Sequence, residues 1–154
     1  MHNHEPPGYD CPFCSYGRGV FNALVQEPHV VERTSATLAF VSPKWWINNP
    51  GHVIVVPIAH HENLYDLPDE VAATLAAAVR RAAIALKAAY GCDGTSTRQH
   101  NEPAGNQDVW HLHVHVFPRY DGDDLYMSPS RSTDPAEMSA YAEQLRTAYE
   151  AFAG

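Results

Sequence analysis

The sequence predicts an α+β fold, in which a mostly antiparallel sheet carries one long helix and is followed by a carboxyl-terminal helix. Short apolar stretches bounded by turn residues are typical of strands. Two longer stretches carry apolar residues at helical spacing. The strands and helices do not alternate regularly along the chain, which argues against a parallel sheet.

The first half of the chain contains a tail and two strands. Residues 1–10 are polar and rich in proline and histidine, so we expect a flexible tail, with a single domain over 11–154. Residues 34–41 are expected to form a strand, and 43–50 a loop with two tryptophans. The strand at 52–57 has a continuously apolar centre and is expected to be buried on both faces.

Both helices carry recognisable ends. The long helix is expected to begin at Asp66 as N-cap, and Gly91 to end it. Its apolar positions are Val71, Leu75, Val79, Ala82, Leu86 and Tyr90. The last helix has Asp134 as N-cap and Glu137 to complete a capping box. Its apolar positions are Met138, Tyr141, Leu145, Ala148 and Phe152.

The remaining segments lie between these helices. We expect a strand at 95–101, a polar loop at 102–108, a strand at 111–118 and a turn-rich stretch at 120–134. In the strand at 111–118 three histidines alternate with apolar residues, which would place all three imidazoles on one face.

Composition excludes several classes of protein. A net charge of -8 without a basic stripe argues against binding to a nucleic-acid backbone. No apolar run is long enough to span a membrane, and the amino terminus lacks the layout of a signal peptide, so a cytoplasmic protein is expected. The three cysteines are then expected to be thiols or metal ligands rather than disulfides.

The histidine strand, His111, His113 and His115, is the strongest chemical signal. One neutral imidazole can attack phosphorus while its neighbours orient it and bind phosphoryl oxygens. A metal site built from several of these histidines is the alternative. Ordinary surface histidines are disfavoured, because three at strict alternation are improbable by composition.

Cys11 and Cys14 form the second signal. A two-residue gap lets both thiolates reach one metal, but it also suits a redox pair. Zinc is favoured because the redox motif usually opens a helix after a strand, whereas this pair follows a polar tail. Further ligands can come from His60, His61 or His111, and Cys92 is expected to be a lone buried thiol.

These residues resemble the histidine triad (HIT) superfamily. The resemblance rests on the three alternating histidines with Gln107 four positions ahead of the first, and on 50–57, His60 and Leu64, and Asn101 to Arg119 in the family order. It covers about residues 11–120. It implies a HIT-like fold with a five-stranded antiparallel sheet, usually assembled as a homodimer.

The resemblance also implies chemistry. Family members bind nucleotides and transfer or hydrolyse a nucleoside monophosphate through a nucleotidyl-histidine intermediate. His113 corresponds to the nucleophile, while His115 and Gln107 are expected to hold phosphoryl oxygens. Zinc-containing members have a structural zinc whose ligands correspond to Cys11, Cys14, His60 and His111 in this chain.

Substrate contacts follow from the same resemblance. They correspond to Asn101, Gly105, Asp108, Ser42 and His52, and a satisfied core histidine is an equally good interpretation of His52. Asp108 stands where many relatives have serine or threonine, and a carboxylate there would repel phosphate. Trp45 and Trp46 suit either a contact with a base or an interface, or the packing of a loop.

The sequence therefore predicts a zinc-containing nucleotide hydrolase or transferase. A nucleotide-binding sensor or adaptor with little turnover is the alternative, and a hydrolase with the three histidines as metal ligands is the third hypothesis. Dinucleoside polyphosphates, nucleoside phosphoramidates and nucleotide sugars all remain open as substrates.

Overall fold

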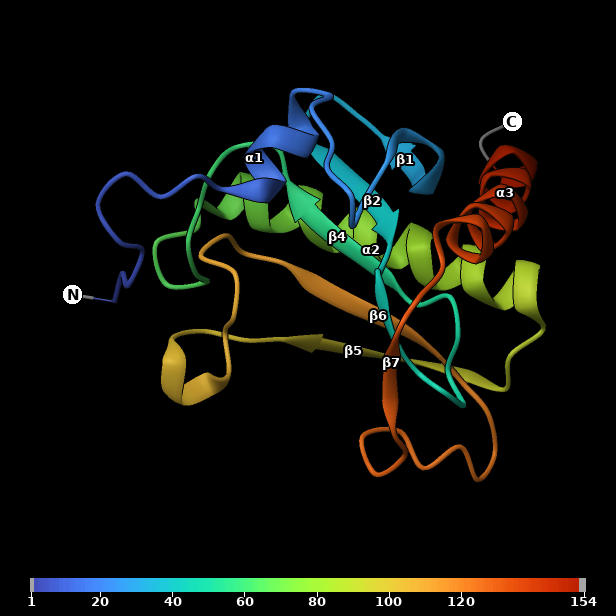
Figure 1. The fold of residues 1–154 in the computed structure, drawn as a ribbon. Helices are drawn as coiled ribbons and strands as arrows, with labels where there is room; N and C mark the ends of the chain where they lie inside the picture. Colours follow the sequence, from blue (N-terminus) through green and yellow to red (C-terminus); the bar gives the residue numbers. More distant parts are fainter. Residues whose placement is uncertain (1, 153–154) are drawn as a thin grey trace.

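A five-stranded antiparallel sheet with the order β1-β2-β4-β6-β5 forms the centre of the protein (Figure 1). The computed structural model describes residues 2–152, so Met1 of the predicted tail and residues 153–154 of the predicted domain lie outside the described part. The strands are β1 (Val30–Arg33), β2 (Thr37–Val41), β4 (Val53–Pro57), β5 (Gly94–Gln99) and β6 (Val114–Arg119). The predicted α+β fold and five-stranded sheet are confirmed.

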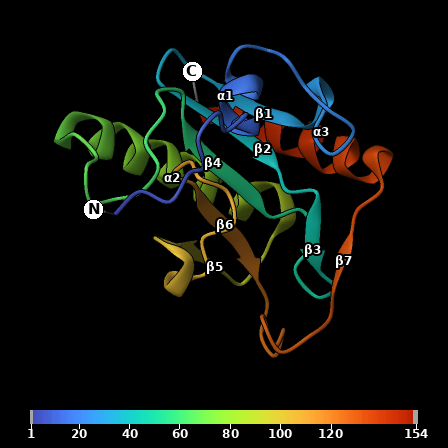
Figure 2. The same cartoon turned by 60° about the vertical axis from the view of Figure 1, so that its left-hand side comes forward.

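The long helices pack against one face of this sheet. They are α2 (Asp69–Tyr90) and α3 (Pro135–Phe152), and the short helix α1 (Pro12–Gly17) lies near the amino terminus on the other side (Figures 1 and 2). Ala39 and Val41 of β2 belong to the core beneath the long helices. Leu38 and Phe40 belong to the core around α1. This alternation explains why the whole of β2 is buried.

The N-cap of the long helix lies two residues later than predicted. Asp69 is its first residue and Pro68 stands at the N-cap, so Asp66 does not cap it. A proline pushes the residue before it out of the helical region, which excludes a helical Leu67. Gly91 ends the helix in the left-handed conformation, with φ of 60°, as predicted. The buried positions are Leu75, Ala78, Ala82, Ala85 and Leu86.

The last helix has the predicted N-cap but not the predicted capping box. Asp134 Oδ1 accepts a hydrogen bond from the backbone N–H of Ala136 at 2.8 Å. Glu137 instead pairs with Arg131, at 2.8 Å. The buried positions are Met138, Ala142, Leu145, Ala148 and Tyr149, whereas Phe152 is exposed.

The predicted loop at 43–50 contains a short strand. β3 (Lys44–Trp46) pairs with β7 (Ser130–Ser132), which lies inside the predicted turn-rich stretch, and Figure 2 shows the two side by side. Trp45 is fully buried and its Nε1–H donates to the Ser42 carbonyl at 2.6 Å, which anchors this small sheet in the core. Trp46 and Lys44 alternate with it and line a cavity on the other side.

The amino-terminal segment contacts the domain. The backbone N–H of Glu5 donates to Glu62 at 3.1 Å, and Asn63 Nδ2 donates to the His2 carbonyl at 3.1 Å. Residues 2–5 therefore have defined partners near residues 62–63 in this structure, while the flexibility of the segment 1–10 stays a prediction. No helix within residues 2–152 combines the length and the apolar character needed to cross a membrane.

Candidate active site and metal centre

Only one of the three alternating histidines lies within a strand. β6 begins at Val114, whereas a strand was predicted from His111. The backbone N–H of Leu112 donates to the His61 carbonyl at 2.6 Å, and that of His111 donates to the Val109 carbonyl at 2.8 Å. These bonds take the segment before β6 out of the sheet ladder.

The three imidazoles consequently have different surroundings. His111 is fully buried and faces two cysteines. His113 is 3% exposed and lines a cavity, together with His115. The expectation of one shared face therefore holds only for His113 and His115.

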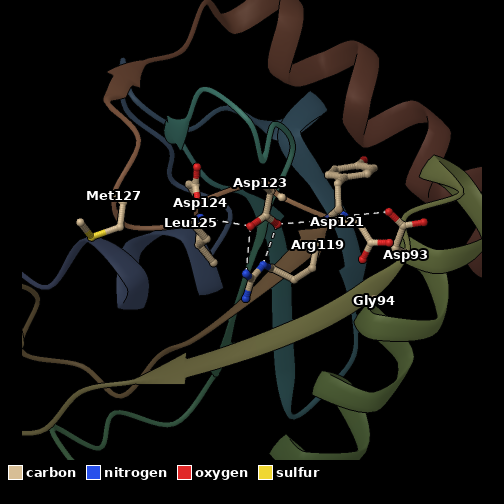
Figure 3. Close-up of a pocket in the computed structure, with 10 residues that line it drawn as sticks. Asp93, Gly94, Arg119, Asp121, Asp123, Asp124, Leu125 and Met127 are labelled. Atoms are coloured by element: carbon tan, nitrogen blue, oxygen red, sulfur yellow. Dashed lines mark hydrogen bonds and ion pairs between the residues drawn. The ribbon is translucent and has the colours of Figure 1, made fainter.

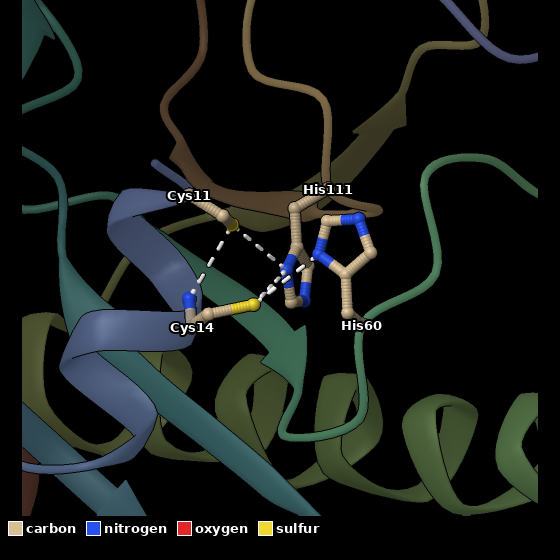
Figure 4. Close-up of side chains that lie close together, drawn as sticks. All are labelled: Cys11, Cys14, His60 and His111. Carbon is tan, nitrogen blue, oxygen red and sulfur yellow. Dashed lines mark hydrogen bonds between the residues drawn. The ribbon is translucent and has the colours of Figure 1, made fainter. Parts of the chain in front are cut away.

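Cys11, Cys14, His60 and His111 converge from three separate segments (Figure 4). Their ligand atoms all lie within 4.8 Å of one another. His111 Nδ1 is 3.2 Å from Cys11 Sγ and 3.6 Å from Cys14 Sγ, and His60 Nδ1 is 3.2 Å from Cys14 Sγ. The structure brings together the four predicted metal ligands.

This group fits a tetrahedral metal. Zn–S bonds of about 2.3 Å and Zn–N bonds of about 2.0 Å give tetrahedral edges of roughly 3.5 Å between sulfur and nitrogen ligands. The opposite ring nitrogens are also bonded: His111 Nε2 donates to the Pro57 carbonyl at 2.9 Å, and His60 Nε2 pairs with Glu5 at 2.9 Å. Such partners orient each imidazole so that Nδ1 presents its lone pair to a metal.

The electrostatics of the group favour a cation at its centre. Burial lowers the pKa of His111 to about 4, which keeps the ring neutral at ordinary pH. Burial and the neighbouring Cys11 raise the pKa of the Cys14 thiol to about 12. A divalent cation would compensate the charge of two adjacent thiolates. Neither His113 nor His115 belongs to the metal-ligating group found among the described residues, which argues against a metal held by the three histidines.

A cavity of about 610 Å³ lies beside the metal-ligand group. One part of its lining is apolar and comes from α1, β2 and β4, with Phe13, Phe40 and Ile54. The other part is polar and mostly basic: Lys44, His52, Arg98, His100, Asn106, Asp108, His113 and His115. The cavity therefore suits a ligand with an apolar ring system at one end and negative charge at the other.

His113 is oriented by its own backbone neighbourhood. Its Nδ1–H donates to the His111 carbonyl at 2.8 Å, which fixes the tautomer and leaves the Nε2 lone pair free. Nε2 is 3.6 Å from Asp108 Oδ1, and the Asp108 side chain is 83% exposed. The neighbouring His113 imidazole holds the pKa of the Asp108 carboxyl below its ordinary value.

His52, which is buried, and His115, which is partly buried, form a pair beside His113. His52 Nε2 is 3.2 Å from His115 Nδ1, so one ring donates to the other. Burial, with the charge of Arg98, lowers the pKa of His52 to about 3. Burial and the neighbouring His52 also lower the pKa of His115. His52 is buried and lines the cavity, but only one of its ring nitrogens is hydrogen-bonded, because Nδ1 has no partner among the described residues. Its contact with substrate stays a prediction.

Gln107 and Asn101 brace loops and do not line the cavity. Gln107 Nε2 donates to the Glu62 carbonyl at 2.6 Å, and its Oε1 accepts from the Glu102 N–H at 2.9 Å. Asn101 Oδ1 accepts from the Leu64 N–H at 2.8 Å. In this structure these amides connect the loop before the histidines to residues 62–64.

Gly105 and Ser42 differ in their relation to the cavity. The Gly105 carbonyl bonds the His100 ring, and Gly105 is outside the cavity lining. Ser42 lines the cavity, and its hydroxyl donates to the Lys44 carbonyl at 3.0 Å.

Sequence reasoning missed two basic residues at the end of β5. Arg98 lies in β5 and His100 follows its last residue, Gln99. Both line the cavity, and Arg98 lies opposite His115 in the sheet register. The alternation of Arg98 and His100 was visible in the sequence, whereas the pairing of β5 with β6, which places Arg98 opposite His115, was not.

A second hollow of about 530 Å³ lies at the other end of β6 (Figure 3). Asp123, at its centre, accepts from Arg119 at 2.7 and 2.9 Å and from Asn49 Nδ2 at 2.7 Å. Arg119 holds the pKa of this carboxyl far below its usual range. Because both carboxylate oxygens are engaged, Asp123 fixes the turn after β6.

Comparisons with known proteins agree with this geometry. The family model of the HIT domain matches residues 24–122. An uncharacterized HIT-like protein of Methanocaldococcus jannaschii is 33% identical over 117 residues, which cover 73% of this chain and 81% of that protein.

Solved structures share the fold. A Hit-like protein involved in cell-cycle regulation from Bartonella henselae has a TM-score of 0.79 at 29% identity, covering 90% of this chain and 96% of that one. A Zn-bound histidine triad family protein from Mycobacterium smegmatis has a TM-score of 0.78 at 28% identity, covering 94% and 96%.

Two further relatives carry enzyme names. An adenylylsulfatase of Arabidopsis thaliana is 30% identical over 95 residues, which are 62% of this chain and 48% of that enzyme. An adenosine 5'-monophosphoramidase of Saccharomyces cerevisiae is 32% identical over 71 residues, 46% of this chain and 42% of that enzyme. The match thus spans less than half of each enzyme.

Proposed function

Because this chain belongs to the HIT domain family, we propose that it cleaves a nucleoside monophosphate from its leaving group through a covalent intermediate on His113. The observation that carries the proposal is the His113 imidazole, which lines the cavity and whose Nδ1–H donates to the His111 carbonyl, so that the lone pair is on Nε2. The two relatives with enzyme names, both acting on adenylyl compounds, support the reaction class.

The reaction takes two displacements at phosphorus. The lone pair of His113 Nε2 forms a bond to the α-phosphorus, while the bond to the leaving group breaks and its electron pair departs with the leaving atom. Water then attacks the phosphorus, and the phosphorus–nitrogen bond returns its pair to Nε2. The proton of the water passes to solvent. Donors around the cavity hold the phosphoryl oxygens as their charge redistributes.

The apolar part of the cavity would hold the nucleobase. Phe13, Phe40 and Ile54 offer aromatic and aliphatic surfaces, which suit a planar ring. In the nucleotide complex the phosphate then lies over His113 and His115. Gln107 and Asn101 act in this proposal by fixing the loop before His113, since their amides bond neighbouring backbone groups.

Zinc is the metal that we propose for Cys11, Cys14, His60 and His111. Two thiolates and two imidazoles are a characteristic zinc donor set, and a solved neighbour is zinc-bound. With four protein ligands the ion supplies rigidity and leaves no position for substrate. It would hold His111, whose carbonyl orients His113. A homodimer, implied by the family resemblance, stays a prediction that sedimentation analysis can measure.

The proposal is tested by trapping the intermediate. The protein is mixed with dinucleoside polyphosphate, adenylyl sulfate and nucleoside phosphoramidate in turn and quenched within one turnover. Intact-mass spectrometry should then show an increase equal to one nucleoside monophosphate, located on His113 by peptide mapping. An adduct on a different residue, or turnover without any adduct, would contradict the covalent route.

A nucleotide sensor with little turnover is the second candidate, and Asp108 favours it. This carboxylate lies 3.6 Å from the attacking nitrogen, where it repels an incoming phosphate. Asp108→Asn is expected to raise kcat/KM by about two- to fivefold, which corresponds to roughly 0.5–1 kcal/mol for an exposed charge. Glu143→Gln, an exposed change on α3, is the matched control.

The same assay separates the two candidates. A measurable kcat in the wild type that increases in Asp108→Asn supports an enzyme slowed by this carboxylate. Nucleotide binding without turnover in both proteins would favour the sensor. An unchanged or lower kcat/KM in Asp108→Asn would show that repulsion by Asp108 does not limit the reaction.

A further inference from the structure

Arg98 is a cation placed beside the triad by sheet pairing. It lies on β5 directly opposite His115 of β6, and cross-strand partners point to the same face of a sheet. Arg98 lines the same cavity as His113 and His115. The site therefore contains a permanent positive charge in addition to its histidines, because a guanidinium stays protonated at all ordinary pH values.

Three aromatic rings fix the position of this guanidinium. The Cζ atom of Arg98 is 4.9 Å from the centre of the Trp46 ring, 4.8 Å from Tyr126 and 5.4 Å from Phe117. Rings at these distances attract a cation by their negative faces. They come from β3, β6 and the segment before β7, so the cation is held by elements distant in sequence.

No carboxylate in residues 2–152 forms an ion pair with Arg98, and its buried Nε has no hydrogen-bond partner there. By contrast, Arg81 pairs with Glu32, and Arg119 pairs with Asp123. A partly buried, unpaired guanidinium is costly, and an anionic ligand is the natural partner. The chain has a net charge of -8, so carboxylates that could pair with an arginine are abundant. The lack of a carboxylate partner for Arg98 among the described residues therefore supports a role in binding an external anion.

The sheet order places this cation on the far side of the nucleophile from the apolar lining. Phe40 and Ile54 belong to β2 and β4, and Arg98 belongs to β5. β6, which contains His115 and begins directly after His113, lies between β4 and β5. A nucleotide whose base contacts the apolar lining and whose α-phosphate meets His113 would extend its leaving group toward β5.

We propose that Arg98 binds the leaving group as an oxyanion, and that the site selects substrates that release a phosphate or a sulfate over those that release an amine. This inference rests on the proposed function. When the bond between the α-phosphorus and the bridging oxygen breaks, its electron pair stays on that oxygen, and the guanidinium stabilises the added charge. An amine must instead gain a proton as it leaves, and arginine does not supply one.

The test compares leaving groups in Arg98→Met, which keeps a long side chain but removes the charge and the donors. For adenylyl sulfate and for a dinucleoside polyphosphate, kcat/KM should fall by about tenfold to a hundredfold. For adenosine phosphoramidate it should change by less than about threefold. Arg80→Met, an exposed change on α2, is the control for net charge. An equal fall for both leaving-group classes would overturn the proposal.

Direct binding of inorganic pyrophosphate separates this inference from the proposed function. Calorimetry should show weaker binding to Arg98→Met than to the wild type or Arg80→Met, even in a protein without turnover. Unchanged binding in Arg98→Met would contradict an anion site at Arg98. Arg98→Lys, which keeps the charge but loses the forked donors, should bind pyrophosphate with intermediate affinity. If Arg98→Met is poorly folded, the pyrophosphate affinity of Arg98→Lys still tests the anion site. The sulfate and polyphosphate substrates show which oxyanion the site prefers.

Discussion

His113→Asn is expected to lower kcat/KM for nucleotide cleavage by at least about a thousandfold, with little change in the Kd for nucleotide. The substitution removes the Nε2 lone pair that would attack phosphorus. An asparagine amide can still donate to the His111 carbonyl, which accepts from His113 Nδ1 at 2.8 Å in the structure. The cavity is thus left nearly intact while its reactive atom is lost.

Turnover, binding and adduct formation should be measured together on this variant. Steady-state kinetics should give the loss, and calorimetry with a nucleoside monophosphate should give the retained affinity. Intact-mass spectrometry should find no nucleotidyl adduct. His2→Asn, which removes an exposed imidazole from the amino-terminal segment, should behave as wild type. Full activity in His113→Asn would rule out His113 as the nucleophile.

Cys11→Ser is expected to reduce zinc from about one ion per chain to a substoichiometric level and to lower the free energy of unfolding by roughly 4 kcal/mol. Cys11 is buried and lies 3.2 Å from His111 Nδ1, so a bound ion would tie α1 to the segment before β6. A cross-link over a loop of this length restricts the unfolded chain by about that amount. Activity should fall as well, since the His111 carbonyl orients His113.

Elemental analysis and thermal unfolding, with and without a chelator, measure these effects. Cys92→Ala is the matched control, because Cys92 is buried in the core and does not belong to the metal-ligand group. This variant should keep its zinc. His113→Asn should also keep its zinc, which would distinguish this site from one built on the triad. Stoichiometric zinc in Cys11→Ser, or stability that does not respond to the chelator, would contradict the assignment.

The signals that could be read from the sequence were local ones. Cys11 and Cys14 lie two residues apart, and the histidines alternate within five residues, so their chemistry was visible without the fold. β4 was predicted because its centre is continuously apolar. Gly91 was predicted to end the long helix because a left-handed residue was needed there.

The signals that could not be read depend on distant partners. β3 exists because it pairs with β7, more than eighty residues later, and neither strand is long enough to be recognised alone. The separation of His111 from the other two histidines arises from the bond between Leu112 N–H and the His61 carbonyl. The position of Arg98 in the site depends on His115, its partner across the sheet, and on three aromatic rings from other elements.

The position of the four metal ligands along the chain bears on the order of folding. Cys11 and His111 are 100 residues apart, and His60 lies near the midpoint between them. In a zinc finger, closely spaced ligands let the ion organise a short peptide. Here the ligands meet only after β4, α2 and the segment before β6 have assembled, because closing such long loops is slow and entropically unfavourable. We therefore expect metal binding to be a late step in folding. The ion would stabilise the chain after it has folded and would not direct its early collapse.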